Sequence, residues 1–289
     1  MRRVILFACV LCCALWVRAD IPTVEKQALE ELYYSTNGMH WVCKWDLSQP
    51  VTGWYGVLLR DGHVVGLELF HNNLMGTLPE SIGSLAKLET LNLAFNNLTG
   101  QLPKTIFDLK ELRVLKIEMN RFRGEVPETI AKMTKLVEFS AFNNVLSGRI
   151  PSGIGQLKSL EILNLSSNNL LGRIPESIGA LQKLQSLGLF ENQLYGHIPE
   201  SIGELTALKE LVLANNQLGG AIPESIGSLA NLEILQIQHN GFDSYENLGK
   251  LNTRQLLVFD YDVEKSEIDY RNLNFSRSRM ADTKFEDDH

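Results

Sequence analysis

Residues 160–183 read LEILNLSSNNLLGRIPESIGALQK, and rows of the same 24-residue pattern precede and follow them without a gap. The shared pattern is LxxLxLxxNxLxGxIPxxIxxLxx. Self-similarity at this period is typical of a solenoid, in which each row buries its apolar face against its neighbours. Complete rows begin at Val64, Leu88, Leu112, Leu136, Leu160, Leu184 and Leu208, and a divergent eighth row begins at Leu232.

The first half of each row predicts a short strand. Apolar residues at the fourth and sixth positions enclose an exposed fifth position, which is the two-residue period of a strand. Stacked rows would place these strands side by side in parallel, about 4.8 Å apart. The apolar pairs are Leu67/Leu69, Leu91/Leu93, Leu115/Ile117, Phe139/Ala141, Leu163/Leu165, Leu187/Leu189, Leu211/Leu213 and Leu235/Ile237.

The ninth position of every row is an asparagine. Where the chain turns inward after the strand, backbone groups are buried and need partners. Because a side-chain amide both donates and accepts, these residues are predicted to form a structural ladder rather than a binding site. The ladder comprises Asn72, Asn96, Asn120, Asn144, Asn168, Asn192, Asn216 and Asn240.

The second half of each row combines a glycine at the thirteenth position with a proline at the sixteenth. Glycine permits a tight bend, and proline holds an extended conformation without a backbone donor. The stretch that follows, such as residues 80–85, is too short for a good α-helix and predicts a 3₁₀ turn on the convex side.

Three segments show the strongest likeness to a known family: NNLTGQLPKTIFDL at 96–109, NNLLGRIPESIGAL at 168–181 and NQLGGAIPESIGSL at 216–229. They resemble the plant-type extracellular leucine-rich repeat, whose hallmark is LxGxIPxxIGxL, and residues 28–57 resemble its N-terminal cap. The resemblance covers about residues 24–250. It implies an α/β solenoid: a right-handed superhelix with a parallel concave sheet and a 3₁₀ or irregular convex side. The family's caps often carry cysteine pairs, which this chain lacks.

The N-terminus predicts a signal peptide over residues 1–19. Two arginines precede an uncharged 14-residue run, which is short for a membrane span, and small residues lead to Asp20. An uncleaved anchor is the alternative. Cleavage would remove three of the four cysteines, leaving Cys43 without an internal partner. It would also remove three arginines and no acid, so the net charge would fall from −7 to −10.

The remaining chain divides into a cap at 20–63, the solenoid at 64–251, a second cap at 252–271 and a polar, disordered tail at 272–289. Thr23 is expected to cap a first helix. Four aromatic residues are expected to cover the open end of the stack, with an aromatic ligand cage as the alternative. The tail has no apolar run long enough for a membrane span. The aromatic residues are Trp41, Trp45, Trp54 and Tyr55.

The concave face is the predicted binding surface. Four phenylalanines at its seventh and eighth positions are expected to be exposed and to suit a protein or peptide contact, unless the rings simply pack on each other. Acidic residues outnumber Lys116 on this face, which favours a basic partner and disfavours nucleic acid. The candidate contact residues are Phe70, His71, Phe95, Glu118, Glu138, Phe142, Phe190 and Glu191.

Catalytic and metal motifs are lacking, and no cofactor is predicted. His71 and His239 stand seven rows apart, roughly 34 Å at the strand spacing, which is too far to share a metal. Glu118 and Glu138 lie in neighbouring rows and could approach as a carboxylate pair, but nothing encloses them. Three glycosylation sequons occur, at Asn97, Asn164 and Asn274.

These features predict a secreted, non-enzymatic recognition module that binds a protein or peptide on its concave face. The resemblance implies receptor-like or defence-type roles. Two alternatives stay open: a ligand-sensing subunit that acts beside a membrane-anchored co-receptor, and a structural or adhesive surface protein. A glycan on Asn164 would obstruct the middle of the concave groove.

Overall fold

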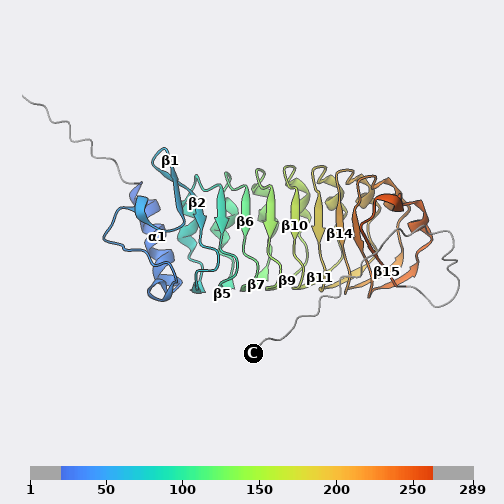
Figure 1. The fold of residues 1–289 in the computed structure, drawn as a ribbon, viewed down its shortest axis with the longest axis horizontal. Helices are drawn as coiled ribbons and strands as arrows, with labels where there is room; N and C mark the ends of the chain where they lie inside the picture. The colour runs from blue at the N-terminus through green and yellow to red at the C-terminus, as the bar shows by residue number, and fades with distance from the viewer. Residues whose placement is uncertain (1–20, 263–289) are drawn as a thin grey trace, which may run out of the picture.

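The computed structural model describes residues 21–262, which form one elongated stack with helix α1 (Thr23–Ser35) at its N-terminal end (Figure 1). The predicted signal peptide, the tail at 272–289 with Asn274, and residues 263–271 of the predicted second cap lie outside the described residues. Within them, no helix is long and apolar enough to cross a membrane.

The predicted strands form a ten-stranded sheet, here called the large sheet, in the order β1-β2-β4-β6-β8-β10-β12-β14-β16-β18. Only β1 and β2 are antiparallel; each later strand pairs in parallel with the strand one row away. The strands are β1 Val57–Arg60, β2 His63–Glu68, β4 Thr90–Asn92, β6 Val114–Lys116, β8 Glu138–Ser140, β10 Ile162–Asn164, β12 Ser186–Gly188, β14 Glu210–Val212, β16 Ile234–Gln236 and β18 Val258–Asp260.

A second, eight-stranded sheet, here called the small sheet, was not predicted from the sequence. Its strands follow the ladder asparagines, and in the seven complete rows each ends near the thirteenth-position glycine, whose φ is positive. The strands are β3 Met75–Thr77, β5 Asn97–Gln101, β7 Arg121–Glu125, β9 Val145–Gly148, β11 Asn169–Gly172, β13 Gln193–Gly196, β15 Gln217–Ala221 and β17 Gly241–Ser244.

The predicted 3₁₀ turns follow the prolines of the seven complete rows, and divergent turns follow in the eighth row and beyond. Further short turns, η1 (Gly38–His40) and η2 (Val51–Gly53), lie in the N-terminal cap. The remaining turns are η3 Glu80–Ser84, η4 Lys104–Asp108, η5 Glu128–Lys132, η6 Ser152–Gln156, η7 Glu176–Ala180, η8 Glu200–Glu204, η9 Glu224–Ser228, η10 Glu246–Lys250 and η11 Thr253–Gln255.

One continuous apolar core runs from Ile21 to Leu251. The strand pairs face inward, and two apolar residues in or directly after most 3₁₀ turns, such as Ile178 and Leu181, close the core from the other side. No row could bury these side chains alone, so the stacking of rows provides most of the stabilisation.

The asparagine ladder satisfies the buried turn after each strand, as predicted. Asn120 donates through Nδ2 to the carbonyl of Leu93 in the preceding row at 2.9 Å, and its Oδ1 accepts the N–H of Leu98 at 2.9 Å. At the N-terminal end, Asn72 accepts the N–H of the half-buried Cys43 at 2.6 Å. Asp262 extends the pattern at the other end, because it accepts the N–H of Asn240 at 3.2 Å.

The N-terminal cap covers the open end of the core with stacked rings. Trp41, Trp45 and Trp54 are buried, and the Trp45–Trp54 ring centroids lie 4.8 Å apart. Tyr55 is exposed and does not contribute to this cover. The expected cap at Thr23 is wrong: Pro22 precedes the helix, and no side chain caps it.

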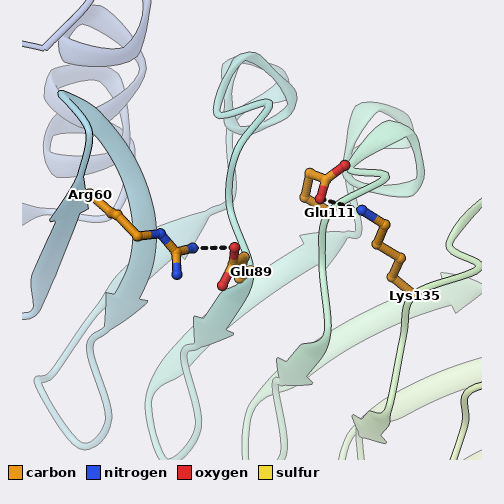
Figure 2. Close-up of polar contacts among 4 residues, drawn as sticks. All are labelled: Arg60, Glu89, Glu111 and Lys135. Atoms are coloured by element: carbon orange, nitrogen blue, oxygen red, sulfur yellow. Dashed lines mark hydrogen bonds and ion pairs between the residues drawn. The ribbon is translucent and has the colours of Figure 1, made fainter.

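Exposed ion pairs join successive rows along the edge where the chain enters the large sheet (Figure 2). Arg60 of β1 pairs with Glu89, and Lys135 pairs with Glu111 at 2.5 Å between Nζ and Oε2. The hydrogen bonds from Arg60 and Lys135 lower the pKa of Glu89 and Glu111 respectively. Because these side chains are solvated, such pairs contribute little to stability.

Candidate functional site

The candidate site lies at the rim of the large sheet, where the seventh and eighth positions follow each strand. All eight residues at the eighth position have left-handed backbone, with φ between 49° and 57°. For residues other than glycine this conformation costs roughly 1 kcal/mol, and bulky side chains tolerate it poorly. Phe95 and Met119 nevertheless occupy it, so these rows present large side chains in spite of the local cost.

Phe70 and Phe95 form an aromatic pair at the N-terminal part of this rim. Their ring centroids lie 5.2 Å apart at an interplanar angle of 58°, and Phe70 also lies 6.0 Å from the ring of His71. Phe70 is 49% exposed and Phe95 40%. The rings therefore contact each other and still present much of their surface to solvent.

The expectation of four exposed phenylalanines is wrong for two of them. Phe142 and Phe190 are half-buried, and neither has a ring partner among the described residues. Their rows are separated by a full row, so they cannot pair as Phe70 and Phe95 do. The apolar patch is thus confined to the first two rows.

Glu118 lies one row beyond Phe95, and the expectation that it is exposed is also wrong. The residue is 9% exposed, and its Oε2 has no hydrogen-bond partner. Burial raises the pKa of Glu118, against the opposing effect of hydrogen bonds from its own backbone N–H and the Ser140 hydroxyl. A carboxyl group with a raised pKa and an unpartnered oxygen, at the rim of the large sheet, is a candidate for ligand contact.

Glu138 does not form the carboxylate pair with Glu118 that neighbouring rows made conceivable. It pairs instead with Lys116 across one row, at 3.0 Å between Oε1 and Nζ. Lys116, the one lysine of this face among residues 21–262, is therefore neutralised. Three other acids of this face accept hydrogen bonds from the adjacent row: Glu68 from Asn92, Glu191 from Ser167 and Glu210 from Ser186.

Side chains at the eighth position contact one another along the rim. Asn143 donates to the sulfur of Met119 at 2.8 Å, and Ser167 donates to Glu191 at 2.8 Å. The ring of His239 contacts Asn215 at 2.7 Å, far from His71. The described residues contain no group of three histidine, cysteine or acidic side chains that could hold a metal ion.

The two sequons within the described residues differ in exposure. Asn97 is exposed at the start of β5, on the small sheet. Asn164 is half-buried on the large sheet, and its Oδ1 accepts the N–H of Ser166 at 3.1 Å. Of the two, only Asn164 lies on the face that carries the candidate site.

Sequence reasoning missed Ser140 and Asn92, which hold the acids of this face in place. Asn92 lies opposite Glu68 in the parallel register, whereas the buried Ser140 lies opposite Lys116 and donates to Glu118, two positions beyond Lys116. The contact between Glu68 and Asn92 could have been derived from the 24-residue period, since residues 24 apart are neighbours, whereas Ser140 is 22 residues from Glu118.

Comparison with known proteins supports this architecture. The model of the family described as a leucine-rich repeat region matches residues 67–166 and 152–272. Comparison with curated protein sequences found no match.

Three similar solved structures span a range of likeness. The ectodomain of the Arabidopsis thaliana receptor kinase GASSHO1/SCHENGEN3, in complex with CASPARIAN STRIP INTEGRITY FACTOR 2, has a TM-score of 0.76 and 30% identity over 81% of this chain. The Arabidopsis receptor kinase HAESA, in complex with the peptide hormone IDA and the co-receptor SERK1, has a TM-score of 0.59 and 34% identity over 66% of this chain. A plant ice-binding protein has a TM-score of 0.70 at 24% identity over 84% of this chain and 87% of its own, which shows the fold alone.

The chain spans only 29% and 34% of the lengths of the two receptor structures. Its likeness to them is therefore a likeness to part of each ectodomain. The family model nevertheless covers most of the solenoid, and the two sheets, the 3₁₀ turns and the asparagine ladder agree with it. The chain belongs to the leucine-rich repeat proteins, of the plant extracellular type.

Proposed function

We propose that this protein is a non-enzymatic, extracellular recognition module that binds a peptide or protein on the outer face of the large sheet. The observation that carries the proposal is the contact between Phe70 and Phe95, two rings that remain 49% and 40% exposed. Aromatic anchors with a polar surround are typical of binding hot spots.

The adjacent rows supply the charge of the proposed site. Glu118 belongs to the row that follows the row of Phe95, and one of its carboxylate oxygens has no hydrogen-bond partner. Lys116 is already paired with Glu138. The unpartnered oxygen of Glu118 is buried in the free protein, so a basic side chain of the partner would give it the hydrogen bond that it lacks once the neighbouring side chains move aside. We therefore propose a ligand with an apolar residue for the phenylalanine pair, followed by a lysine or arginine.

Two of the structural relatives support this choice of ligand class. The structures of GASSHO1/SCHENGEN3 and HAESA contain a bound factor and a bound peptide hormone, respectively. The HAESA structure also contains a co-receptor. By analogy, we propose that the present protein acts outside the cell, in a receptor-like role, and that a membrane-anchored co-receptor can join the complex.

The test begins with affinity capture of partners by the secreted protein and continues with dissociation constants for one purified partner. Phe70→Ser with Phe95→Ser should weaken binding at least tenfold, since truncation of a hot-spot residue costs 2 kcal/mol or more, about thirtyfold in affinity. Tyr34→Ser is the matched control, because Tyr34 is a 70% exposed aromatic residue on helix α1.

Equal affinity of the wild type and the double variant, with an unchanged thermal melting curve, would remove the phenylalanine pair from the site. The co-receptor proposal has a separate readout. Cells that express the co-receptor should retain the secreted chain at their surface only when the ligand is present, and free release under both conditions would contradict it.

A further inference from the structure

A second concave surface lies on the small sheet, in a part of the molecule that the proposed function does not use. It is a groove of about 970 Å³ that crosses the ends of β7, β9, β11 and β13. One wall carries Glu125, Arg149 and Arg173 at the fourteenth position of successive rows. The other wall carries Ser147, Leu171 and Tyr195 at the twelfth position.

Glycines form the floor between the two walls. Gly172 and Gly196 have φ values of 90° and 84°, and a Cβ atom on either would approach the Cγ of an arginine to 3.0 or 3.1 Å. The stem of Arg149 therefore lies across Gly172 of the next row, and the stem of Arg173 lies across Gly196. This packing fixes the stems of two exposed arginines that line the groove.

Neither guanidinium group has a hydrogen-bond or ion-pair partner among residues 21–262. Some other basic side chains are paired across rows, as Lys132 is with Asp108 and Lys250 is with Glu224. Glu128, which also lines the groove, already accepts the N–H groups of Ser152 and Gly153 at 2.9 and 2.7 Å. Two adjacent unpaired guanidinium groups favour anions, and carboxylates fit their fork geometry.

The opposite wall adds exposed apolar surface. Leu171 is 40% exposed and Tyr195 is 43% exposed, in neighbouring rows of the small sheet. A ligand for this groove therefore combines negative charge with at least one apolar side chain. The neutral polar side chains of the lining are Ser147, Ser152 and Tyr195, which are too few for the hydroxyl groups of an acidic sugar polymer.

We propose that the groove binds an acidic peptide segment, with carboxylates on Arg149 and Arg173 and an apolar side chain between Leu171 and Tyr195. Four strands at about 4.8 Å span roughly 14 Å, which about four residues of extended peptide cover. Successive side chains of an extended peptide point to opposite faces, so acids two residues apart share one face and can meet the two arginines. Recognition of acidic segments by arginine clusters is an established binding mode.

The test uses a fluorescently labelled hexapeptide of alternating glutamate and leucine, blocked at both ends. The full-length protein should bind it, and Arg149→Gln with Arg173→Gln should weaken binding at least tenfold. The double change Arg121→Gln with Arg123→Gln is the matched control, because it removes the same charge from exposed positions of β7 outside the groove. The control should bind as the wild type does, as should the Phe70 and Phe95 variant.

Two further probes decide the ligand class. The same peptide with glutamine in place of glutamate should lose binding; equal binding of that peptide would overturn the proposal. A galacturonic acid hexamer that binds in an arginine-dependent way while the acidic peptide does not would replace the peptide with an acidic sugar. Equal binding by the Arg149/Arg173 variant and the control would also overturn the assignment, provided that both variants melt as the wild type does.

Discussion

The side-chain amide of Asn168 donates to the carbonyl oxygen of Ala141, 27 residues earlier, at 3.0 Å. The same amide also donates to Leu165 and Ser166, and its oxygen accepts the N–H of Leu146 at 3.0 Å. One buried side chain therefore satisfies backbone groups of two neighbouring rows. This relationship recurs along the stack and explains why every row keeps asparagine at its ninth position.

The first prediction concerns this ladder. Asn168→Ala would leave several buried backbone groups without partners, so the free energy of unfolding should fall by about 2–4 kcal/mol. Urea denaturation followed by circular dichroism measures the change. Asn169→Ala is the control, since Asn169 is exposed one residue later, and its effect should stay within about 0.5 kcal/mol. Equal effects of the two substitutions would contradict the role of the ladder.

The second prediction concerns the join between helix α1 and the first row. Glu25 is buried; it accepts the N–H of Val64 at 2.8 Å and contacts the His63 ring at 2.6 Å. Glu25→Ala should therefore lower the free energy of unfolding by about 1–3 kcal/mol, since the buried N–H of Val64 loses its acceptor. Glu31→Ala, at an exposed position of the same helix, should leave the melting temperature nearly unchanged.

Proteolysis gives an independent readout of the same join. Loss of the Glu25 contact should expose the cap to limited digestion before the rows unfold, because cleavage tracks local opening. Digestion of the Glu25 and Glu31 variants at the same rate would argue against a specific tie between the cap and the first row.

The third prediction concerns Glu118 and pH. Its pKa is raised by burial above the usual value of 4.5, so the folded state binds this proton more tightly than the unfolded state does. Stability is therefore lost as the pH rises from about 4.5 through the raised pKa of the folded protein. Glu118→Gln should raise the free energy of unfolding at pH 7, on the order of 1 kcal/mol, and this gain should vanish below pH 4.5.

Denaturation of the wild type and Glu118→Gln across pH 3–8 measures this difference. Glu191→Gln is the control, since Glu191 is exposed on the same rim. A gain that is constant with pH would assign the effect to packing and not to ionisation. If Glu118 also serves the proposed ligand, the more stable glutamine variant should bind a basic partner less tightly, as functional sites often trade stability for binding.

Much of the fold follows from the 24-residue period, because the period places residues 24 apart in register. The strand pairs, the 3₁₀ turns and the ladder were all predicted on that basis. The small sheet was not predicted, although segments such as Arg121–Glu125 alternate exposed and buried side chains in the way a strand does. The glycine of the thirteenth position had been interpreted only as a bend.

The site was less predictable than the fold. The sequence identified the face and the residues Phe70 and Phe95, but it placed Glu118, Phe142 and Phe190 in solvent. Exposure at the seventh position depends on the side chains of adjacent rows and on where the chain leaves the sheet. Both are properties of the packed stack and not of one row.

The sequence by itself determined the architecture, because a repeat that cannot bury its apolar side chains alone must stack, and an unbroken period leaves one register for stacking. Only the tertiary structure decided which polar groups find partners. Lys116 joins Glu138, Glu118 is left with an unpartnered oxygen, and Arg149 and Arg173 lie unpaired in a groove among the described residues. These outcomes depend on distances of a few ångströms between rows, which residue order does not specify.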